Sequence, residues 1–267
     1  MRSNRLANAS KKARLFLYVL RCWFKAAPYA FFWITIGMFV KPRKGLELLH
    51  NVLHSLDCYS NDPMLGSVNV TDVIKGNADV KIIGQYHIHK KHDTRMLLEL
   101  STLAYLMQAL KPKVVFEIGT FVGRSARLFA VNSPDNTKIF TLDLPQNKAL
   151  HRIGEDYIGT AEAKKITQLF GDSRSFDYSK WYKQCDFVWV DACHDYAFVK
   201  SDTDKALKLC RDGGWIGWHD YRHSKSWDGV TRCVKETYKN YHYIHHIYGT
   251  TIVIMQKKTD IACQAAC

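Results

Sequence analysis

Residues 114–143 constrain the fold more than any other part of this 267-residue chain. The stretch begins with a short apolar run, 114–116, of the kind that forms a parallel strand buried on both faces. Residues 125–131 have the composition of a helix, and the apolar run 139–142 predicts a second strand after it. A strand, a helix and a second strand in this order predict an α/β fold around a mostly parallel sheet.

A sharp turn follows the first strand and forms the first candidate site. Gly119 and Gly123 supply the backbone freedom that such a turn needs, and they allow a ligand to approach the backbone closely. The helix that begins near Ser125 directs its N-terminus at this turn. Asp143 ends the second strand, where a carboxylate in other doubly wound folds accepts both hydroxyls of a ribose. These residues predict a nucleotide-cofactor site.

The turn also resembles a known motif. Glu-Ile-Gly-Thr-Phe-Val-Gly at 117–123 is similar to the first motif of class I S-adenosylmethionine (SAM) methyltransferases, and Asp143 stands where their ribose-binding acid stands. Phe121 replaces the middle glycine of that motif. The resemblance implies that SAM binds at Glu117, Gly119, Thr120, Phe121, Gly123, Ser125, Asp143, Leu144, Asp172, Ser173 and Asp191.

The turn at 117–123 and the residues 171–173 also have interpretations other than SAM binding. The turn could belong to an unrelated α/β domain, whereas a dinucleotide-binding dehydrogenase would require G-x-G-x-x-G, which the turn does not spell. The resemblance assigns Asp172 and Ser173 to the adenine ring, although Gly-Asp-Ser at 171–173 is also an ordinary turn or helix cap.

Strands and helices continue to alternate along the rest of the chain. Five further strands are predicted at residues 166–170, 187–190, 215–218, 243–247 and 251–255, the last two as an antiparallel pair. Apolar helical spacing predicts helices at 96–110 and 196–210, and Gly213 and Gly214 are expected to end the second. The resemblance implies a Rossmann-like class I methyltransferase fold. It would have a seven-stranded, mostly parallel sheet with helices on both faces, plus an N-terminal basic and apolar helical extension.

The chain is expected to contain four segments. They are a basic, aromatic-rich N-terminal segment at 1–44, a cap or substrate-side region at 45–92, the SAM-binding methyltransferase domain at 93–256 and a C-terminal tail at 257–267. In the second segment, 46–56 predicts an amphipathic helix and 81–86 a strand. The histidines at 87, 89 and 92 could form a metal site, but the lack of a nearby cysteine favours an edge strand or a substrate-side loop.

Polar residues follow the fourth and fifth predicted strands. Val-Asp-Ala-Cys-His-Asp-Tyr at 190–196 and Trp-His-Asp-Tyr at 218–221, with glycines at 213, 214 and 229, resemble the family-24-like methyltransferases of antibiotics and glycans. Catechol O-methyltransferases are distantly related. They hold a divalent cation with an Asp after the fourth strand and an Asp-Asn pair after the fifth. Their base is a Lys three residues past the first Asp.

Those places are taken here by Asp191, His194 and the pair His219 and Asp220, so that one histidine replaces the Lys and another replaces an acid. The resemblance implies that His194, Asp191 and Asp220 are catalytic. It also implies that Asp191, His219 and Asp220 hold a metal ion.

Methyl transfer from a sulfonium is an in-line displacement, so the enzyme must align the acceptor hydroxyl and make it a better nucleophile. Mg²⁺ or another divalent cation held by Asp191 and Asp220 could act as a Lewis acid, with His194 as general base. Without metal, His194 oriented by either Asp could remove the proton alone. A third interpretation makes His219 and Asp220 a structural cap of the strand end. We expect a SAM-dependent O-methyltransferase acting on a hydroxyl of a sugar or other small molecule.

The net charge of +13 is concentrated at the N-terminus. Residues 1–46 contain ten Lys or Arg and no Asp or Glu, which leaves 28 basic and 25 acidic residues in the remainder. This near-neutral body argues against a nucleic-acid methyltransferase. The uncharged run 26–40 is shorter than the ~20 residues of a membrane span. A helix in the interface of an anionic membrane fits better, and it would allow a lipid-linked acceptor. The alternatives are a true span and packing on the body or on a partner subunit of a homo-oligomer.

The eight cysteines form no C-x-x-C pair, which predicts reduced thiols and a cytoplasmic protein, peripheral at the inner face of a membrane if the leader binds lipid. The alternative functions are a nucleotide-binding oxidoreductase, which the glycine pattern disfavours, and a non-catalytic membrane-associated scaffold. The joint presence of Asp143, His194 and Asp220 argues against the scaffold.

Overall fold

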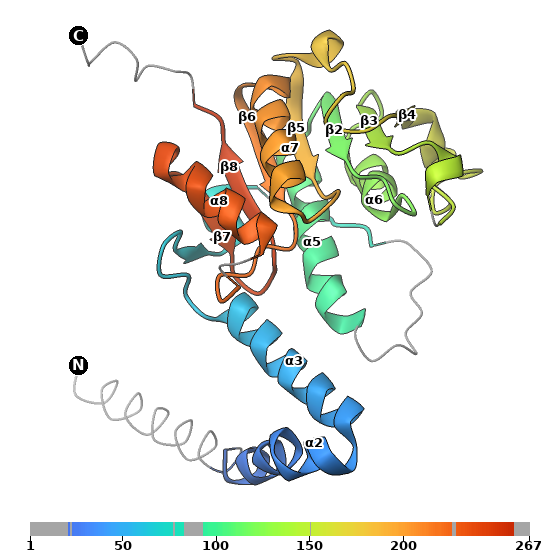
Figure 1. The fold of residues 1–267 in the computed structure, drawn as a ribbon. Coiled ribbons are helices and arrows are strands. Elements are labelled where there is room, and N and C mark those ends of the chain that lie inside the picture. The colour runs from blue at the N-terminus through green and yellow to red at the C-terminus, as the bar shows by residue number, and fades with distance from the viewer. Residues whose placement is uncertain are drawn as a thin grey trace, which may run out of the picture. The chain divides into compact units, whose positions relative to one another are not determined.

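The computed structural model describes residues 21, 23–76, 78–82, 93–149, 151–225 and 228–258. The chain divides into two compact units, Met1–Leu56 and Asp57–Cys267. Figure 1 shows the sheet of the second unit with helices packed along it.

One eight-stranded sheet organises the second unit. Its strands are β1 (Ser67–Val68), β2 (Val114–Ile118), β3 (Lys138–Asp143), β4 (Ile166–Phe170), β5 (Cys185–Val190), β6 (Cys210–Trp218), β7 (Ile244–Ile247) and β8 (Val253–Gln256). Their order across the sheet is β1-β7-β8-β6-β5-β2-β3-β4, and only the pairs that include β8 are antiparallel. The predicted α/β fold is confirmed. The strand beyond the predicted seven is β1, whose two residues are too few to show a hydrophobic period.

Helices cover both faces of this sheet, as predicted (Figure 1). The core on one face includes residues of α5 (Asp93–Leu110) and α6 (Arg124–Asn132), and the core on the other includes residues of α7 (Tyr196–Leu209) and α8 (Gly229–Asn240). Val115 belongs to the first core and Phe116 to the second. Because successive side chains of a strand point to opposite faces, a strand covered on both sides is a continuous apolar run.

Shorter elements connect these helices and strands. They are α4 (Val70–Val73) and three 3₁₀ helices at Gln146–Lys148, Ala161–Lys165 and Ser179–Trp181.

The junction between α7 and β6 differs from the prediction. The helix ends at Leu209, but the strand begins at once at Cys210, so Gly213 and Gly214 lie inside the strand and do not end the helix. Cys210 pairs with Cys185 and Trp215 pairs with Phe187, which leaves residues 211–214 opposite a single residue. Gly213 has a φ of +76°. The glycine pair therefore forms a bulge. Glycines are typical of bulges as well as of helix ends, so the sequence alone does not distinguish the two.

The region before the domain matches its predictions only in part. The predicted helix at 46–56 lies within α3 (Pro42–Tyr59). Lys81 and Ile82 are not in a strand. The rest of the predicted strand 81–86 and the three clustered histidines lie outside the described residues.

The described part of the first unit is helical over residues 23–34, α2 (Ile36–Val40) and most of α3. Many of its large apolar side chains are exposed, with Phe39 at 90%. Among the described helices, none combines the length and the apolar character that a membrane span requires.

Candidate active site

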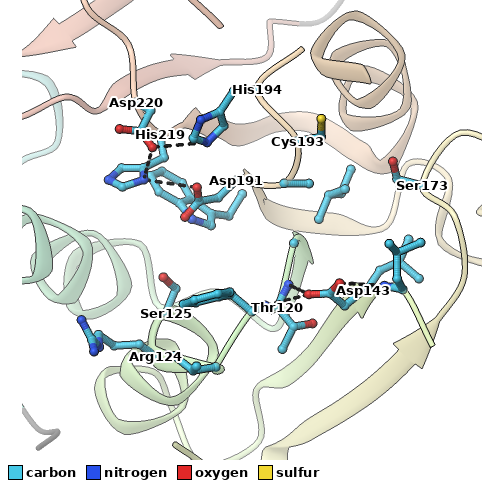
Figure 2. A pocket seen from close by; sticks show the side chains of 18 of the residues that line it. Thr120, Arg124, Ser125, Asp143, Ser173, Asp191, Cys193, His194, His219 and Asp220 are labelled. Carbon is cyan, nitrogen blue, oxygen red and sulfur yellow. Dashed lines mark hydrogen bonds and ion pairs between the residues drawn. The ribbon is translucent and has the colours of Figure 1, made fainter. Parts of the chain in front are cut away.

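A cavity of about 660 Å³ lies at the carboxyl ends of the parallel strands of the second unit (Figure 2). Residues that follow β2, β3, β4, β5 and β6 all line it. Open α/β sheets bind their ligands at this edge. The predicted site residues in its lining are Gly119, Thr120, Phe121, Ser125, Asp143, Leu144, Asp172, Ser173, Asp191, His194, His219 and Asp220.

The glycine turn forms one wall of the cavity, and Asp143 holds it in place. One oxygen of this carboxylate accepts the backbone N–H groups of Thr120 at 3.1 Å and Phe121 at 2.7 Å, and the other accepts that of Leu144 at 2.7 Å. A carboxylate has about four acceptor positions, so one remains for a ligand hydroxyl. Gly119 cannot be replaced here, because a Cβ would lie 2.2 Å from the carbonyl oxygen of Asp191.

Phe121 takes the place of the missing middle glycine at a conformational cost. Its φ is +50°, in the left-handed region that glycine occupies freely. The side chain is 59% exposed, and its ring packs on that of His151 at 4.2 Å between centroids. The backbone therefore adopts a conformation that suits glycine, while the ring adds an apolar surface to the cavity.

Glu117 and Gly123 support the turn but do not line the cavity. The carboxyl of Glu117 is buried and accepts the Thr141 hydroxyl at 2.5 Å. Burial, together with the charges of Asp191 and Asp143, raises the pKa of this carboxyl well above its usual range. Gly123 begins α6 with a φ of +84°, and a Cβ there would meet the Tyr157 ring at 2.5 Å.

A histidine surrounded by carboxylates forms the opposite wall (Figure 2). Nδ1 of His219 lies 3.2 Å from Oδ1 of Asp191 and 3.4 Å from Oδ2 of Asp220. Its Nε2 lies 3.1 Å from Glu99 of α5, which also accepts the backbone N–H and the hydroxyl of Thr251. Two strand ends and one helix thus fix the orientation of a single imidazole.

These contacts set the protonation of both partners. Burial alone would lower the pKa of His219, but Asp191 and Glu99 outweigh it and raise that pKa well above the usual range. Burial alone would raise the pKa of Glu99, but hydrogen bonds from His219 and Thr251 lower it to about 2. The surrounding carboxylates therefore favour the protonated form of His219.

The same residues fit a divalent cation. Asp191, His219 and Asp220 each offer one ligand atom, and these atoms lie within 4.8 Å of one another. Glu99 occupies the far nitrogen of the imidazole, as a carboxylate typically does behind a metal-bound histidine. A cation would displace the proton of His219, because a ligating imidazole is neutral.

His194 stands beside this cluster in the loop between β5 and α7. Its side chain is 53% exposed, and Nε2 lies 3.3 Å from Oδ2 of Asp220. Gly229, at the start of α8, fixes the position of this loop. A Cβ there would lie 2.1 Å from the carbonyl oxygen of His194, so only glycine permits the contact. This explains the glycine that follows the histidine motif in the sequence.

Several cavity residues were absent from the sequence predictions. They include Glu99, Leu100, Leu103, Arg124, His151, Trp189 and Phe198. The sequence carried a signal for Glu99, which is an acid at the spacing of the apolar positions 96, 100, 103 and 107. No comparable pattern marked His151, which lies in an irregular loop.

Comparisons with known proteins agree with this geometry. Residues 116–221 match the family model described as a methyltransferase domain. A caffeoyl-CoA O-methyltransferase of Stellaria longipes is 25% identical over 122 residues, which are 43% of this chain and 49% of that protein. The chain thus spans about half the length of this curated relative.

Similar solved structures are also methyltransferases. The O-methyltransferase TomG of Streptomyces achromogenes, solved in complex with SAM, has a TM-score of 0.50 and 17% identity, covering 67% of this chain and 92% of its own. A putative O-methyltransferase of Klebsiella pneumoniae has a TM-score of 0.49 and 16% identity, covering 79% and 100% of the two chains.

The sheet order and the matched sequence from Phe116 to Tyr221 are those expected of a class I methyltransferase domain over this part of the chain. The resemblance noted at residues 117–123 is thereby confirmed.

Proposed function

We propose that the protein is a SAM-dependent O-methyltransferase that methylates a hydroxyl of a sugar or other small molecule. One observation carries this proposal. A glycine turn held by Asp143 and a histidine–carboxylate cluster around Asp220 form opposite walls of one cavity (Figure 2). A site that aligns a methyl donor with a hydroxyl needs two halves. Here the donor half is the wall formed by the glycine turn and Asp143, and the acceptor half is the wall formed by the cluster around Asp220.

The donor half can hold a nucleoside. Asp143 retains an acceptor position for a ribose hydroxyl, while Leu144 and Phe121 present apolar surface beside it. Ser173 and Asp172 line the cavity beyond β4, where the base of the nucleoside would lie.

In the acceptor half, His194 is the group that takes the proton. Its Nε2 faces the cavity next to Asp220, whose charge stabilises the imidazolium that forms. Arg222 holds the other oxygen of Asp220 at 3.2 Å, so the carboxylate is fixed from both sides. When the acceptor hydroxyl is positioned against this imidazole, transfer of its proton to Nε2 makes the acceptor oxygen a better nucleophile towards the methyl group.

Asp191, His219 and Asp220 would hold a divalent cation, which when bound supplies Lewis-acid polarisation of the acceptor oxygen. Two carboxylates suit Mg²⁺, and the imidazole extends the set to Mn²⁺ and other first-row ions. Contacts of His219 with Asp191 and Glu99 hold these side chains in their present positions.

Mass spectrometry tests the reaction. Isotope-labelled SAM is incubated with the full-length protein and a panel of hydroxylated acceptors, with and without a chelator. Transfer of the label to oxygen is expected, with loss of activity on chelation. Activity that survives both chelation and His194→Ala would exclude the proposed mechanism.

We also propose that residues 1–44 lie on the surface of an anionic membrane, where a lipid-linked acceptor would be found. The segment carries basic residues and no acids. Its described part exposes Trp23, Phe24, Phe31 and Phe39. Exposed aromatic side chains beside Lys and Arg suit the headgroup region of an anionic bilayer.

Sedimentation with lipid vesicles tests this second proposal. The full-length protein should sediment with vesicles that contain phosphatidylserine and much less with vesicles of phosphatidylcholine alone. Replacing Lys41 and Arg43 by Glu should weaken the binding free energy to these vesicles by about 1 kcal/mol for each positive charge lost. Reversing Lys164 and Lys208 in the second unit is the matched control. Equal binding to both vesicle types would contradict the electrostatic part of the proposal.

A further inference from the structure

Tyr221 follows Asp220 directly, but the mechanism above does not use it. Its side chain is 1% exposed and does not line the cavity. Its hydroxyl donates to Oδ2 of Asp62 at 2.6 Å, across 159 residues of sequence. The loop that carries Asp220 is therefore connected to a distant segment of the chain, at 57–62.

Three side-chain contacts join this segment to the loop 221–224. They are Asp62 to Tyr221 at 2.6 Å, Ser60 to His223 at 3.1 Å and Asp57 to the backbone N–H of Ser224 at 2.9 Å. The residue numbers rise along one segment as they fall along the other, so the two segments lie antiparallel. The loop can neither slide nor move away without breaking several of these contacts.

Asp62 is fixed within its own segment. It is 1% exposed, and its Oδ1 accepts the backbone N–H groups of Met64 at 2.8 Å and Leu65 at 2.9 Å. Burial alone would raise the pKa of Asp62, but the Tyr221 hydroxyl and these two N–H groups lower it. The carboxylate form is therefore favoured, and a hydrogen bond from a hydroxyl to a carboxylate is among the strong ones.

Asp220 has a strained backbone next to this anchored tyrosine. Its φ of +59° lies in the left-handed region, which is costly for a residue other than glycine. Such a conformation persists only where the surrounding structure holds it. Tyr221 supplies two restraints, because its backbone N–H donates to the carbonyl oxygen of Thr251 at 3.0 Å and its hydroxyl donates to Asp62.

We propose that Asp62 and Tyr221 are positioning residues of the acceptor half. Their hydrogen bond holds the left-handed backbone of Asp220 and so keeps its carboxylate against His194 and His219. Without this bond the loop relaxes, and the carboxylate moves away from both imidazoles. The inference rests on the proposed function, because it concerns the placement of the proposed base and of the proposed cation site.

Tyr221→Phe tests the inference, because it removes the hydroxyl and keeps the ring. With an acceptor identified by mass spectrometry, kcat should fall about 10–100-fold, since a small displacement of reacting groups is costly. Binding of Mn²⁺ alone, measured by electron paramagnetic resonance, should weaken about 10-fold. The calorimetric affinity for S-adenosylhomocysteine should change by less than about 2-fold, because the Asp143 turn lies at other strand ends and distant sites behave independently.

Tyr105→Phe is the matched control. The Tyr105 hydroxyl lies on α5, outside the cavity lining, and donates to the backbone carbonyl oxygens of Ile74 at 2.8 Å and Gly76 at 3.1 Å. Removing it also costs the protein a hydrogen bond, but kcat and the Mn²⁺ affinity should stay as in the wild type. In a double-mutant cycle, Asp62→Ala should lower kcat less in Tyr221→Phe than in the wild type, because the shared bond is already lost.

The inference is overturned if Tyr221→Phe matches Tyr105→Phe in kcat or in Mn²⁺ affinity. It is also overturned if Tyr221→Phe weakens S-adenosylhomocysteine as much as it lowers kcat, which would indicate a general structural role. Should Asp62→Ala fail to fold, Tyr221→Phe decides alone.

Failure of the proposed function gives a different result. A wild type that binds Mn²⁺ but methylates no acceptor would contradict the proposed function, and the Mn²⁺ affinities would still decide this inference. A wild type that transfers the methyl group without binding Mn²⁺ leaves the decision to kcat. A wild type that does neither would overturn both.

Discussion

Nε2 of His194 lies 3.3 Å from Oδ2 of Asp220. The same oxygen lies 3.4 Å from Nδ1 of His219, so one carboxylate connects the proposed base to the proposed cation site. Asp220 holds this position at a φ of +59°, and backbone strain of that kind is concentrated at functional sites. The loop after β6 is therefore shaped around the position of this carboxylate.

Replacing His194 by Ala should lower kcat about 10²–10⁴-fold and change the affinity for SAM little, because the base acts on the acceptor and not on the donor. Steady-state kinetics together with calorimetry of SAM measures both effects. His242→Ala, at an exposed position outside the cavity, is the control. If His194→Ala lowered only the affinity for SAM, the residue would belong to the donor half instead.

Glu99→Gln should weaken binding of Mn²⁺ by about 10–100-fold, because the carboxylate orients His219 from behind. Titration followed by electron paramagnetic resonance reads the free ion directly, with no donor or acceptor present. Glu155→Gln, at an exposed site away from the cavity, should bind as the wild type does. Unchanged affinity in Glu99→Gln would place the ion elsewhere.

Phe121→Gly should be more stable than Phe121→Ala by about 0.5–1 kcal/mol. Left-handed backbone costs a non-glycine residue about 1–2 kcal/mol, which the greater chain entropy of unfolded glycine offsets in part. Both variants lose the ring, so the comparison isolates the backbone. Urea denaturation of the two variants measures the difference. An alanine variant at least as stable as the glycine variant would show that the turn is not strained.

Asp202→Asn should stabilise the fold at pH 7.5 by about 1–3 kcal/mol. Burial raises the pKa of Asp202 from 3.8 to about 6, despite the opposing effect of Ser173. Between these values the folded state binds a proton that the unfolded state releases, so this group's contribution to the free energy of unfolding falls as pH rises through the window. The advantage of the variant should shrink towards pH 4. Urea unfolding at several pH values, with Asp204→Asn as control, checks this sign. A pH-independent difference would contradict it.

The sequence predicted the helices and strands correctly where a residue pattern has a single structural meaning. The runs at 114–116 and 187–190 are apolar because both faces of β2 and β5 are buried, and their positions follow from that pattern. Gly213 and Gly214 were misassigned because a bulge and a helix stop need the same residue type. Glu99 and Asp202 could not be assigned a role from sequence. Glu99 is distinguished by its contact with His219, which lies 120 residues away in the sequence. Asp202 is distinguished by being buried without a hydrogen-bond partner among the described residues.

Binding of the methyl donor by the Asp143 turn is the central claim, and isothermal titration calorimetry with SAM and S-adenosylhomocysteine tests it most directly. The wild type should release heat with both ligands, and Asp143→Ala should weaken both at least 10-fold, because the carboxylate holds the turn and offers its remaining acceptor position to the ribose. Absence of heat in the wild type, or equal affinity in a folded Asp143→Ala variant, would contradict the account.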